Sequence, residues 1–332
     1  MTLSKDGTDA VPASSHVSNS SSSVVIPNPQ VDHLLQKLSL QPINRVWCAS
    51  IENVSSEQSM LNILLSVLQS SLKSPNFDEV LQTIKTHFFH RRFLSVFNNP
   101  QHLSVYVLRY VPTRVLAYYD FFRKCGPITK LLQRNAVVCC LGSGSTSELN
   151  SLCHTFAALL YEESAERSIS LVEIKRRLIV HIQDLFDWSS IQRPILNKIR
   201  VHCGLSNDRL VVSFDQSDLL DPYSSRFKLA NKCHLVTLMF VLNELFAESR
   251  IKALKFLTQL VETMQIGSML LVLDSASDFS QLNSKSDSNS IKLQTELWMY
   301  HLLDSLNGLK TLAKNDAQWF RISGCQLGNS KL

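Results

Sequence analysis

A glycine-rich turn follows an apolar run at residues 137–149 and has the composition of a ligand-binding loop. The segment reads VVCCLGSGSTSEL, with Gly142, Ser143 and Gly144 at the turn. Gly142 permits a tight turn, Gly144 lets the backbone approach a ligand closely, and a helix from about Thr146 offers free N–H groups. A lone G-x-G also occurs in ordinary strand–turn–helix connections. Thr146 replaces the third glycine of the dinucleotide fingerprint, which argues against a pyrophosphate ligand.

Acidic side chains follow the next two apolar runs. Asp184 comes just after the run Leu178–Ile182, where an acid at the end of a second strand can hold a ribose through its hydroxyl groups. Asp218 follows the run Leu210–Phe214. A carboxylate there can accept a hydrogen bond from an adenine amino group while Leu219 packs on the base. A surface turn is an equal alternative for Asp218.

A polar pair follows the fourth apolar run. Asn243 and Glu244 come directly after His234–Leu242. In an open α/β sheet the fourth strand lies beside the first at the topological switch point, where ligands bind outside the carboxyl ends of the strands. Polar groups at the ends of three successive strands, together with a G-x-G loop, predict an adenosyl pocket.

A parallel sheet is needed to bring these residues together, and the sequence pattern predicts one. Apolar runs without alternation are typical of strands that helices cover on both faces. Segments with helical periodicity separate most of them. We therefore predict an α/β fold, a doubly wound Rossmann-like sheet in residues 135–332. Its strands are expected at Ala136–Leu141, Leu178–Ile182, Leu210–Phe214, His234–Leu242 and Met269–Leu273.

Two local features refine this prediction. Ser145 and Glu148 have the spacing of a capping box, which marks a helix start after the first strand. The distance from Gly144 to Asp184 is longer than the usual ~20 residues between such a loop and its acid. The polar stretch Glu162–Ser170 is therefore the expected insertion.

The chain before residue 135 differs in character. Residues 1–30 are rich in Ser, Asn and Pro, and we expect a disordered tail. In residues 31–134 apolar side chains recur with helical spacing, and Pro112 is expected to separate two helices. Residues 31–135 carry 12 basic and 6 acidic residues, whereas 136–332 carry 20 of each. The positive excess of a chain with net charge +5 therefore lies in this helical module.

The composition excludes several classes of protein. A hydrophobic fraction of 45% and a charged fraction of 18% are those of a globular chain. No apolar run approaches the ~20 residues of a spanning helix, so no membrane span is expected. The 8 cysteines include no C-x-x-C pair, which argues against a structural zinc site and a disulfide framework, and no metal is expected.

Several strings of residues carry a resemblance to a known family. The most specific are the R-Y-x-P-x-R segment Arg109–Arg114 and the string from Thr237 to Leu245, whereas the G-x-G is generic. The others are Tyr118-Tyr119, Val137–Leu149, Asp184–Ser189, Phe214–Leu220, Leu270–Ser275, Trp298–Leu303 and Trp319–Arg321. From about residue 31 to 323 the chain resembles class I S-adenosylmethionine-dependent methyltransferases, and more specifically the fungal 25S ribosomal RNA uridine-N3-methyltransferase family.

The sequence departs from that family pattern in two places. The acid often found just before the first glycine is Cys140 here, so one possible contact to the amino acid end of the cofactor is absent. The methyltransferase sheet usually ends in an antiparallel hairpin, but only nine residues follow the candidate sixth strand Trp319–Ser323. We therefore expect an incomplete final hairpin, with the seventh strand missing or altered.

The resemblance implies methyl transfer from S-adenosylmethionine to N3 of a uridine in large-subunit ribosomal RNA, in the pre-60S particle and the nucleolus. Glu244 is the candidate that orients or deprotonates the base, and Asn243 the candidate that bonds a carbonyl edge. An equal alternative is that both side chains only line the site of the methionine end of the cofactor. The target base must be unpaired or extruded. The candidate cofactor-binding residues are Gly142, Ser143, Gly144, Asp184, Asp218 and Leu219.

The basic helical module is the expected RNA contact. The run from Lys85 to Arg92 mixes cations with Phe88 and Phe89, which could stack on bases. Phosphate contacts would give salt-dependent affinity. The alternative places both phenylalanines in the core beneath a solvated basic face. The candidate RNA-binding residues are Lys85, Arg91, Arg92, Arg109 and Arg114.

Two other functions fit parts of the sequence. A non-catalytic methyltransferase-like factor that binds pre-ribosomal RNA is favoured by Cys140 and by the incomplete C-terminal hairpin. A methyltransferase for protein or small molecules is disfavoured by the positive helical module, because a neutral substrate gives no reason for that charge.

Overall fold

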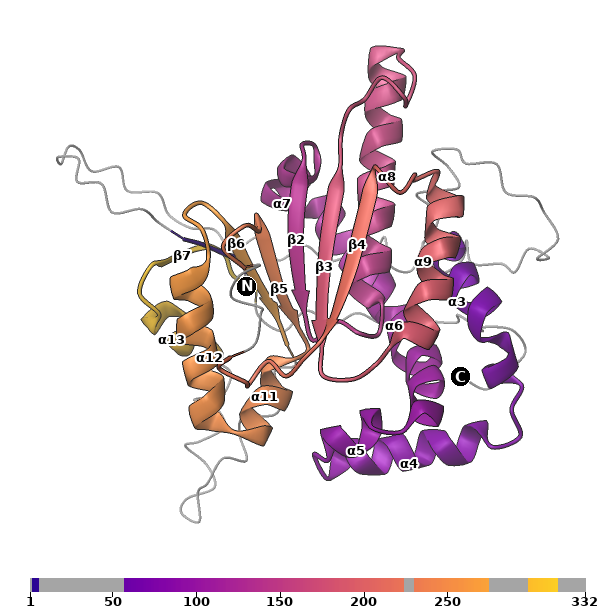
Figure 1. The fold of residues 1–332 in the computed structure, drawn as a ribbon, viewed down its shortest axis with the longest axis vertical. Helices are drawn as coiled ribbons and strands as arrows, with labels where there is room; N and C mark the ends of the chain where they lie inside the picture. The colour runs from indigo at the N-terminus through magenta and orange to yellow at the C-terminus, as the bar shows by residue number, and fades with distance from the viewer. Residues whose placement is uncertain (1, 6–56, 224–229, 275–297, 316–332) are drawn as a thin grey trace.

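The computed structural model describes residues 2–5, 57–223, 230–274 and 298–315, which form a twisted sheet with helices on both faces (Figure 1). The sheet has seven strands in the order β4-β3-β2-β5-β6-β1-β7. The strands are β1 (Thr2–Lys5), β2 (Ala136–Leu141), β3 (Leu178–Asp184), β4 (Leu210–Gln216), β5 (Leu235–Met239), β6 (Met269–Leu273) and β7 (Leu309–Ala313).

The five strands from β2 to β6 are parallel, and they are the five that the apolar runs predict. The doubly wound prediction is confirmed, because β2 has β3 on one side and β5 on the other. The prediction for the fourth strand is too long. β5 ends at Met239, and Leu242 already begins the helix α11 (Leu242–Glu248). Phe240, with φ 60°, turns the chain between them.

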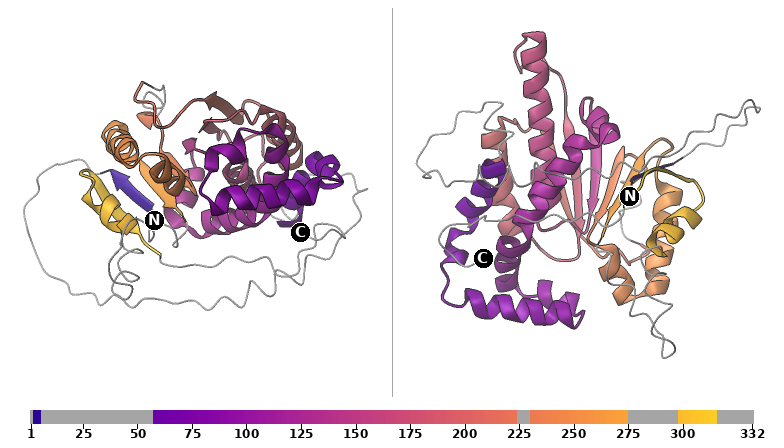
Figure 2. Two further views of the ribbon diagram at one scale, coloured as in Figure 1. Left: turned by 90° about the horizontal axis from the view of Figure 1, so that it is seen from below. Right: turned by 180° about the vertical axis from the view of Figure 1, so that it is seen from behind.

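The far edge of the sheet is built differently from the prediction. β1 lies between β6 and β7 and is antiparallel to both, as the indigo strand in the left view of Figure 2 shows. The predicted disorder of residues 1–30 is therefore wrong for Thr2–Lys5, whose backbone pairs with two strands. The antiparallel strand that we expected to be missing comes from the N-terminal end of the chain. The candidate strand Trp319–Ser323 lies outside the described residues.

A group of helices lies between β1 and β2 in the sequence. They are α3 (Glu57–Leu72), α4 (Phe77–Phe89), α5 (Phe93–Phe97), α6 (Pro100–Lys124) and α7 (Gly126–Leu132). The predicted break at Pro112 is wrong, because α6 runs through it without interruption. A proline inside a helix costs ~3 kcal/mol. Packing offsets this cost, since α6 is buried along most of its length and contacts α3, α4 and α8 (Ser147–Arg167).

Each face of the sheet has its own hydrophobic core. Along β2, Val138 and Cys140 point into the core that α3–α9 share, and Cys139 and Leu141 point into the core beneath α11, α12 and α13. The helical segment and the sheet therefore share one core. The helices that complete these layers are α9 (Ser189–Cys203), α12 (Arg250–Thr263) and α13 (Trp298–Ser305). None of the described helices is long and apolar enough to cross a bilayer.

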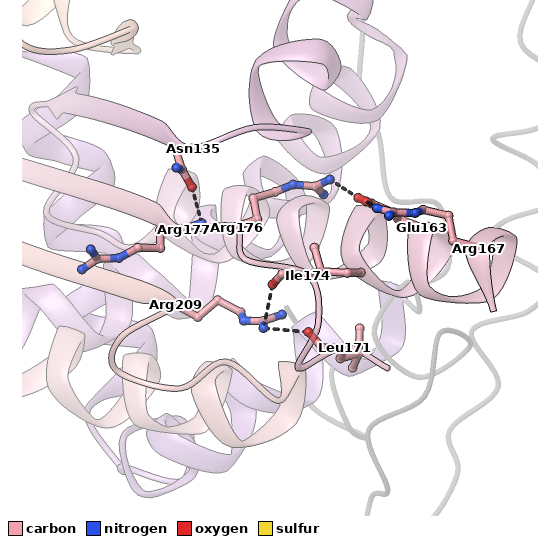
Figure 3. Close-up of polar contacts among 8 residues, drawn as sticks. All are labelled: Asn135, Glu163, Arg167, Leu171, Ile174, Arg176, Arg177 and Arg209. Carbon is pink, nitrogen blue, oxygen red and sulfur yellow. Dashed lines mark hydrogen bonds and ion pairs between the residues drawn. The ribbon is translucent and has the colours of Figure 1, made fainter. Parts of the chain in front are cut away.

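The connection from α8 to β3 explains the long spacing between Gly144 and Asp184 (Figure 3). Most of the stretch predicted as an insertion belongs to α8, which continues to Arg167. Glu163 near the end of α8 forms ion pairs with Arg167, at 2.6 Å, and with Arg176 of the connection. The turn between them is held by bonds from the Arg209 guanidinium to the carbonyl oxygens of Leu171 (2.8 Å) and Ile174 (3.1 Å).

Candidate functional site

A pocket lies at the carboxyl ends of the parallel strands, at the end of the sheet that faces α5 and α11 (Figure 1). It has an empty volume of about 1080 Å³, including its open mouth. Residues from α5, α6, the turn after β2, the ends of β3, β4 and β5, and α11 line it. This is the place where open α/β sheets bind ligands.

The glycine turn forms part of the pocket, but Gly144 has a different role from the predicted one. Gly142 has φ +67°, and a Cβ there would lie 2.5 Å from Val241 Cγ2. Gly142 and Ser143 line the pocket. A Cβ on Gly144 would lie 1.9 Å from the ring of Trp188. Gly144 therefore lacks a side chain because Trp188 packs against it. The sequence predicts a different reason, the close approach of a ligand to the backbone.

Asp184 lies at the pocket and also holds the turn in place. Its Oδ2 accepts a hydrogen bond from the backbone N–H of Gly144 at 2.8 Å, and its Oδ1 accepts one from Phe186 at 3.1 Å. Burial raises the pKa of this carboxyl group. Each carboxylate oxygen has a second lone pair, so Asp184 can also accept hydrogen bonds from a ligand hydroxyl.

Asp218 and Leu219 extend the same wall beyond β4. The Oδ1 atom of Asp218 accepts a hydrogen bond from the Leu220 N–H at 2.8 Å, which fixes the turn. Leu219 is buried, and with Leu185 it lines the pocket. The wall therefore combines carboxylates with apolar side chains, as the sequence predicts for an adenosine site.

Glu148 is a pocket residue that sequence reasoning assigned a different role. The predicted capping box does not form, because α8 has Thr146 at its N-cap without a side-chain bond. The Glu148 carboxyl group is instead buried in the interior and accepts a hydrogen bond from the Thr237 hydroxyl of β5. Burial raises its pKa to about 7. Nothing in the local sequence distinguishes this inward carboxylate from an ordinary capping residue.

Glu244 and Arg114 both line the pocket and interact electrostatically. Glu244 is half-buried at the start of α11, and burial raises its pKa to about 8, with Arg114 opposing and Asp274 adding to the shift. Arg114, predicted to contact RNA, lies in the pocket wall. Its guanidinium group lies 4.6 Å from the centre of the Phe240 ring and donates a hydrogen bond to the Tyr106 hydroxyl.

Asn243 makes different contacts from those predicted. Its side-chain amide donates to Asp274 Oδ1 at 2.5 Å, and its backbone N–H donates to Asp274 Oδ2 at 3.0 Å. Asn243 is not among the described residues that line the pocket. It ties the start of α11 to the end of β6, which fixes the position of Glu244.

The other basic candidates lie on the outer surface of the helical segment. Lys85, Arg92 and Arg109 are exposed, and Arg109 lies over the Tyr110 ring. Arg91 is half-buried, with φ 55°. The two phenylalanines of this run separate. Phe88 packs against four aromatic side chains of α5 and α6, with centroid distances of 5.5–6.2 Å to Phe93, Phe97, Tyr106 and Tyr110, whereas Phe89 is 83% exposed.

The charge of the pocket suits a cationic ligand. Among the described residues that line it, Arg114 is the one base, and the acids are Glu148, Asp184, Asp218, Glu244 and Glu248. The described residues hold no group of histidine, cysteine and acidic side chains that could bind a metal ion. The donor set therefore matches an adenosyl compound that carries positive charge.

Three comparisons bear on this site. The sequence model of a family described as "Putative SAM-dependent methyltransferase" matches residues 65–328. The 25S rRNA (uridine(2843)-N(3))-methyltransferase of Saccharomyces cerevisiae is 26% identical over 273 residues, which cover 76% of this chain and 74% of that protein. The solved structure of an O-methyltransferase family protein from Burkholderia thailandensis has a TM-score of 0.36 and 15% identity. That match covers 75% of this chain and 61% of the solved one.

Proposed function

Because the chain belongs to this family of S-adenosylmethionine-dependent methyltransferases, we propose that it methylates N3 of a uridine in large-subunit ribosomal RNA. The acceptor atom and the class of RNA are those in the name of the yeast relative. The observation that carries the proposal is the half-buried Glu244, whose pKa of about 8 suits a proton acceptor, in a pocket lined by Asp184 and Asp218.

The carboxyl ends of β3 and β4 would hold the adenosine part of the cofactor. In this proposal Asp184 accepts hydrogen bonds from the ribose hydroxyls, Asp218 accepts one from the adenine amino group, and Leu219 packs against the base. The cofactor, when bound, supplies a methyl group on a positively charged sulfur. The carboxylates that line the pocket favour binding of that charge.

Glu244 is the proposed general base. Methylation at N3 requires the loss of the N3 proton, which the Glu244 carboxylate would accept. The nitrogen electron pair would form the new N–C bond as the S–C bond of the cofactor breaks, and the electron pair of that bond would stay on the sulfur. Negative charge that develops on the uracil carbonyl oxygens would be stabilised by Arg114, the one cationic side chain among the described residues that line the pocket. Asn243 holds Glu244 in place through its bonds to Asp274 and is a positioning residue.

The surface around the mouth of the pocket would bind the RNA. Leu94 of α5 lines the pocket and is 46% exposed, and the exposed Phe89 lies a few residues before it. Such side chains can stack on bases that neighbour an extruded uridine. Lys85, Arg92 and Arg109 would contact phosphates, which explains why the positive excess of the chain lies in its helical segment.

A methyl-transfer assay tests the proposed reaction. Purified protein, radiolabelled cofactor and large-subunit rRNA are expected to yield labelled RNA, and digestion to nucleosides should place the label in N3-methyluridine. Glu244→Gln should lower the single-turnover rate by about a hundredfold, the lower range for general-base catalysis. Glu166→Gln, on the exposed end of α8, is the matched control. Label in another nucleoside, or on protein, would contradict the proposal.

Salt-dependent binding tests the RNA surface. The double variant Lys85→Glu/Arg92→Glu should bind rRNA more weakly and show a shallower dependence of affinity on salt concentration, because fewer counterions are released. Lys198→Glu, an exposed base on α9, is the control and should leave the slope unchanged. Equal slopes for all three proteins would refute the assignment of this surface.

We also propose that the reaction takes place on the pre-60S particle in the nucleolus. This part of the proposal rests on the class of RNA named for the yeast relative. Sedimentation of the tagged protein with large-subunit precursors, and its location in intact cells, are the measurements that check it. Sedimentation with mature small subunits would contradict it.

A further inference from the structure

The carboxyl group of Glu148 is a buried acid in the pocket that the proposed reaction does not use. It lies in the first turn of α8 and lines the pocket. It is bonded to Thr237, at a point where β2 and β5 pair in register. An ionisable side chain in such a place is costly to bury unless a charged partner compensates it.

The register of the sheet shows where this carboxyl group lies. Thr237 is directly opposite Cys140, the residue that stands where many methyltransferases have an acid before the first glycine. Glu148 also lies beside the Cys140 and Ser143 side chains. The helix α8 therefore places a carboxylate over the same spot that an acid at position 140 would occupy.

The order of the strands assigns this spot to one end of the cofactor. Asp184 and Asp218 lie at the ends of β3 and β4, where the adenosine is proposed to bind. The sheet continues from there to β2 and then to β5. An elongated ligand with its adenosine over β3 and β4 therefore extends its amino acid end over β2 and β5. Asp184 is already held by two backbone N–H groups of the turns beside it, whereas Glu148 accepts a hydrogen bond from the Thr237 hydroxyl of β5.

From this placement we propose that Glu148 binds the ammonium group of the methionine end of the cofactor, replacing the acid that position 140 lacks. The inference rests on the proposed binding of the adenosine part by Asp184 and Asp218. A carboxylate–ammonium hydrogen bond in a buried site is charge-assisted and discriminates strongly between ligands that carry the ammonium group and ligands that lack it.

Titration calorimetry with two ligands tests the proposal. S-adenosylhomocysteine carries the amino acid end, and 5′-methylthioadenosine lacks it. Glu148→Gln should weaken S-adenosylhomocysteine binding by about ten- to a hundredfold, the usual effect of losing a hydrogen bond to a charged group. It should leave the affinity for methylthioadenosine unchanged. Glu166→Gln, an exposed acid on the same helix, should alter neither affinity.

A second variant tests the equivalence of the two positions. Cys140→Asp added to Glu148→Gln should restore part of the lost affinity for S-adenosylhomocysteine, because the strand then supplies the carboxylate. A uniform loss for both ligands, or no loss for either, would overturn the role of Glu148 and leave it a structural residue. If the unaltered protein binds neither ligand while its thermal unfolding remains cooperative, the proposed cofactor site fails instead.

Discussion

The pH dependence of methyl transfer offers a direct test of Glu244 as the general base. A base with a pKa of about 8 is ionised in about one-tenth of the molecules at pH 7 and in about nine-tenths at pH 9. If proton removal by Glu244 limits the chemical step, the single-turnover rate should rise by roughly tenfold over this range. Glu244→Gln should lose the component of the profile that has its midpoint near pH 8.

Substitutions of Arg114 make this test more specific. Its positive charge lowers the pKa of Glu244 against the effect of burial. Arg114→Met removes that charge, so the midpoint of the pH–rate profile should move upward, on the order of one pH unit. Arg114→Lys retains the charge and should keep the midpoint. Ionisation of the uridine itself would also raise the rate with pH, but that component would remain in Glu244→Gln, whereas the component due to Glu244 would be lost.

The result that would refute the reasoning is therefore a profile whose midpoint does not respond to Arg114→Met. It would mean that the titrating group does not sense the charge of Arg114 and is therefore not Glu244. A flat profile would refute it as well, because the rate would then not depend on an ionised Glu244. Rapid-quench measurements with saturating cofactor and RNA give the required single-turnover rates without interference from product release.

Three further predictions concern stability and are measured by thermal or denaturant unfolding. Gly144→Ala should lower the free energy of unfolding by about 1–3 kcal/mol through overpacking against Trp188, and by less in a Trp188→Leu background. Gly126→Ala is the control and should be near neutral, because a Cβ there meets no atom within 4 Å. As pH rises from about 4.5 to about 7, the free energy of unfolding of the unaltered protein should fall by roughly 3 kcal/mol relative to that of Glu148→Gln. The reason is that Glu148 loses its proton at a higher pH in the folded state than in the unfolded state. Deletion of residues 2–5 should lower the melting temperature and speed amide exchange in β6 and β7, which both pair with β1; unchanged exchange would contradict that pairing.

The helical segment has a role in the pocket as well as on the surface. The guanidinium group of Arg114 on α6 lies over Phe240 at the end of β5, and α5 forms the mouth. An RNA bound to the outer face of α4 and α5 would therefore contact the same helices that shape the site. This arrangement links the proposed RNA surface to the reacting base without a separate domain in between.

The sequence by itself determined the five parallel strands and the edge of the sheet where the site lies. Continuous apolar runs specify strands covered on both faces, and the carboxyl ends of parallel strands meet at one edge. Asp184, Asp218 and Glu244 line the pocket for that reason, since each lies at the end of its strand or shortly after it. The change from a basic helical segment to a sheet-forming segment was likewise visible in the local composition.

The tertiary structure alone decided the contacts between residues far apart in the sequence. The inward direction of Glu148 depends on Thr237, 89 residues away, and the need for glycine at position 144 depends on Trp188. β1 takes its place in the sheet by pairing with strands from the other end of the chain. Local propensity and periodicity describe only neighbours along the chain. Which side chain faces a pocket is settled by packing across elements, and that information is absent from any short segment.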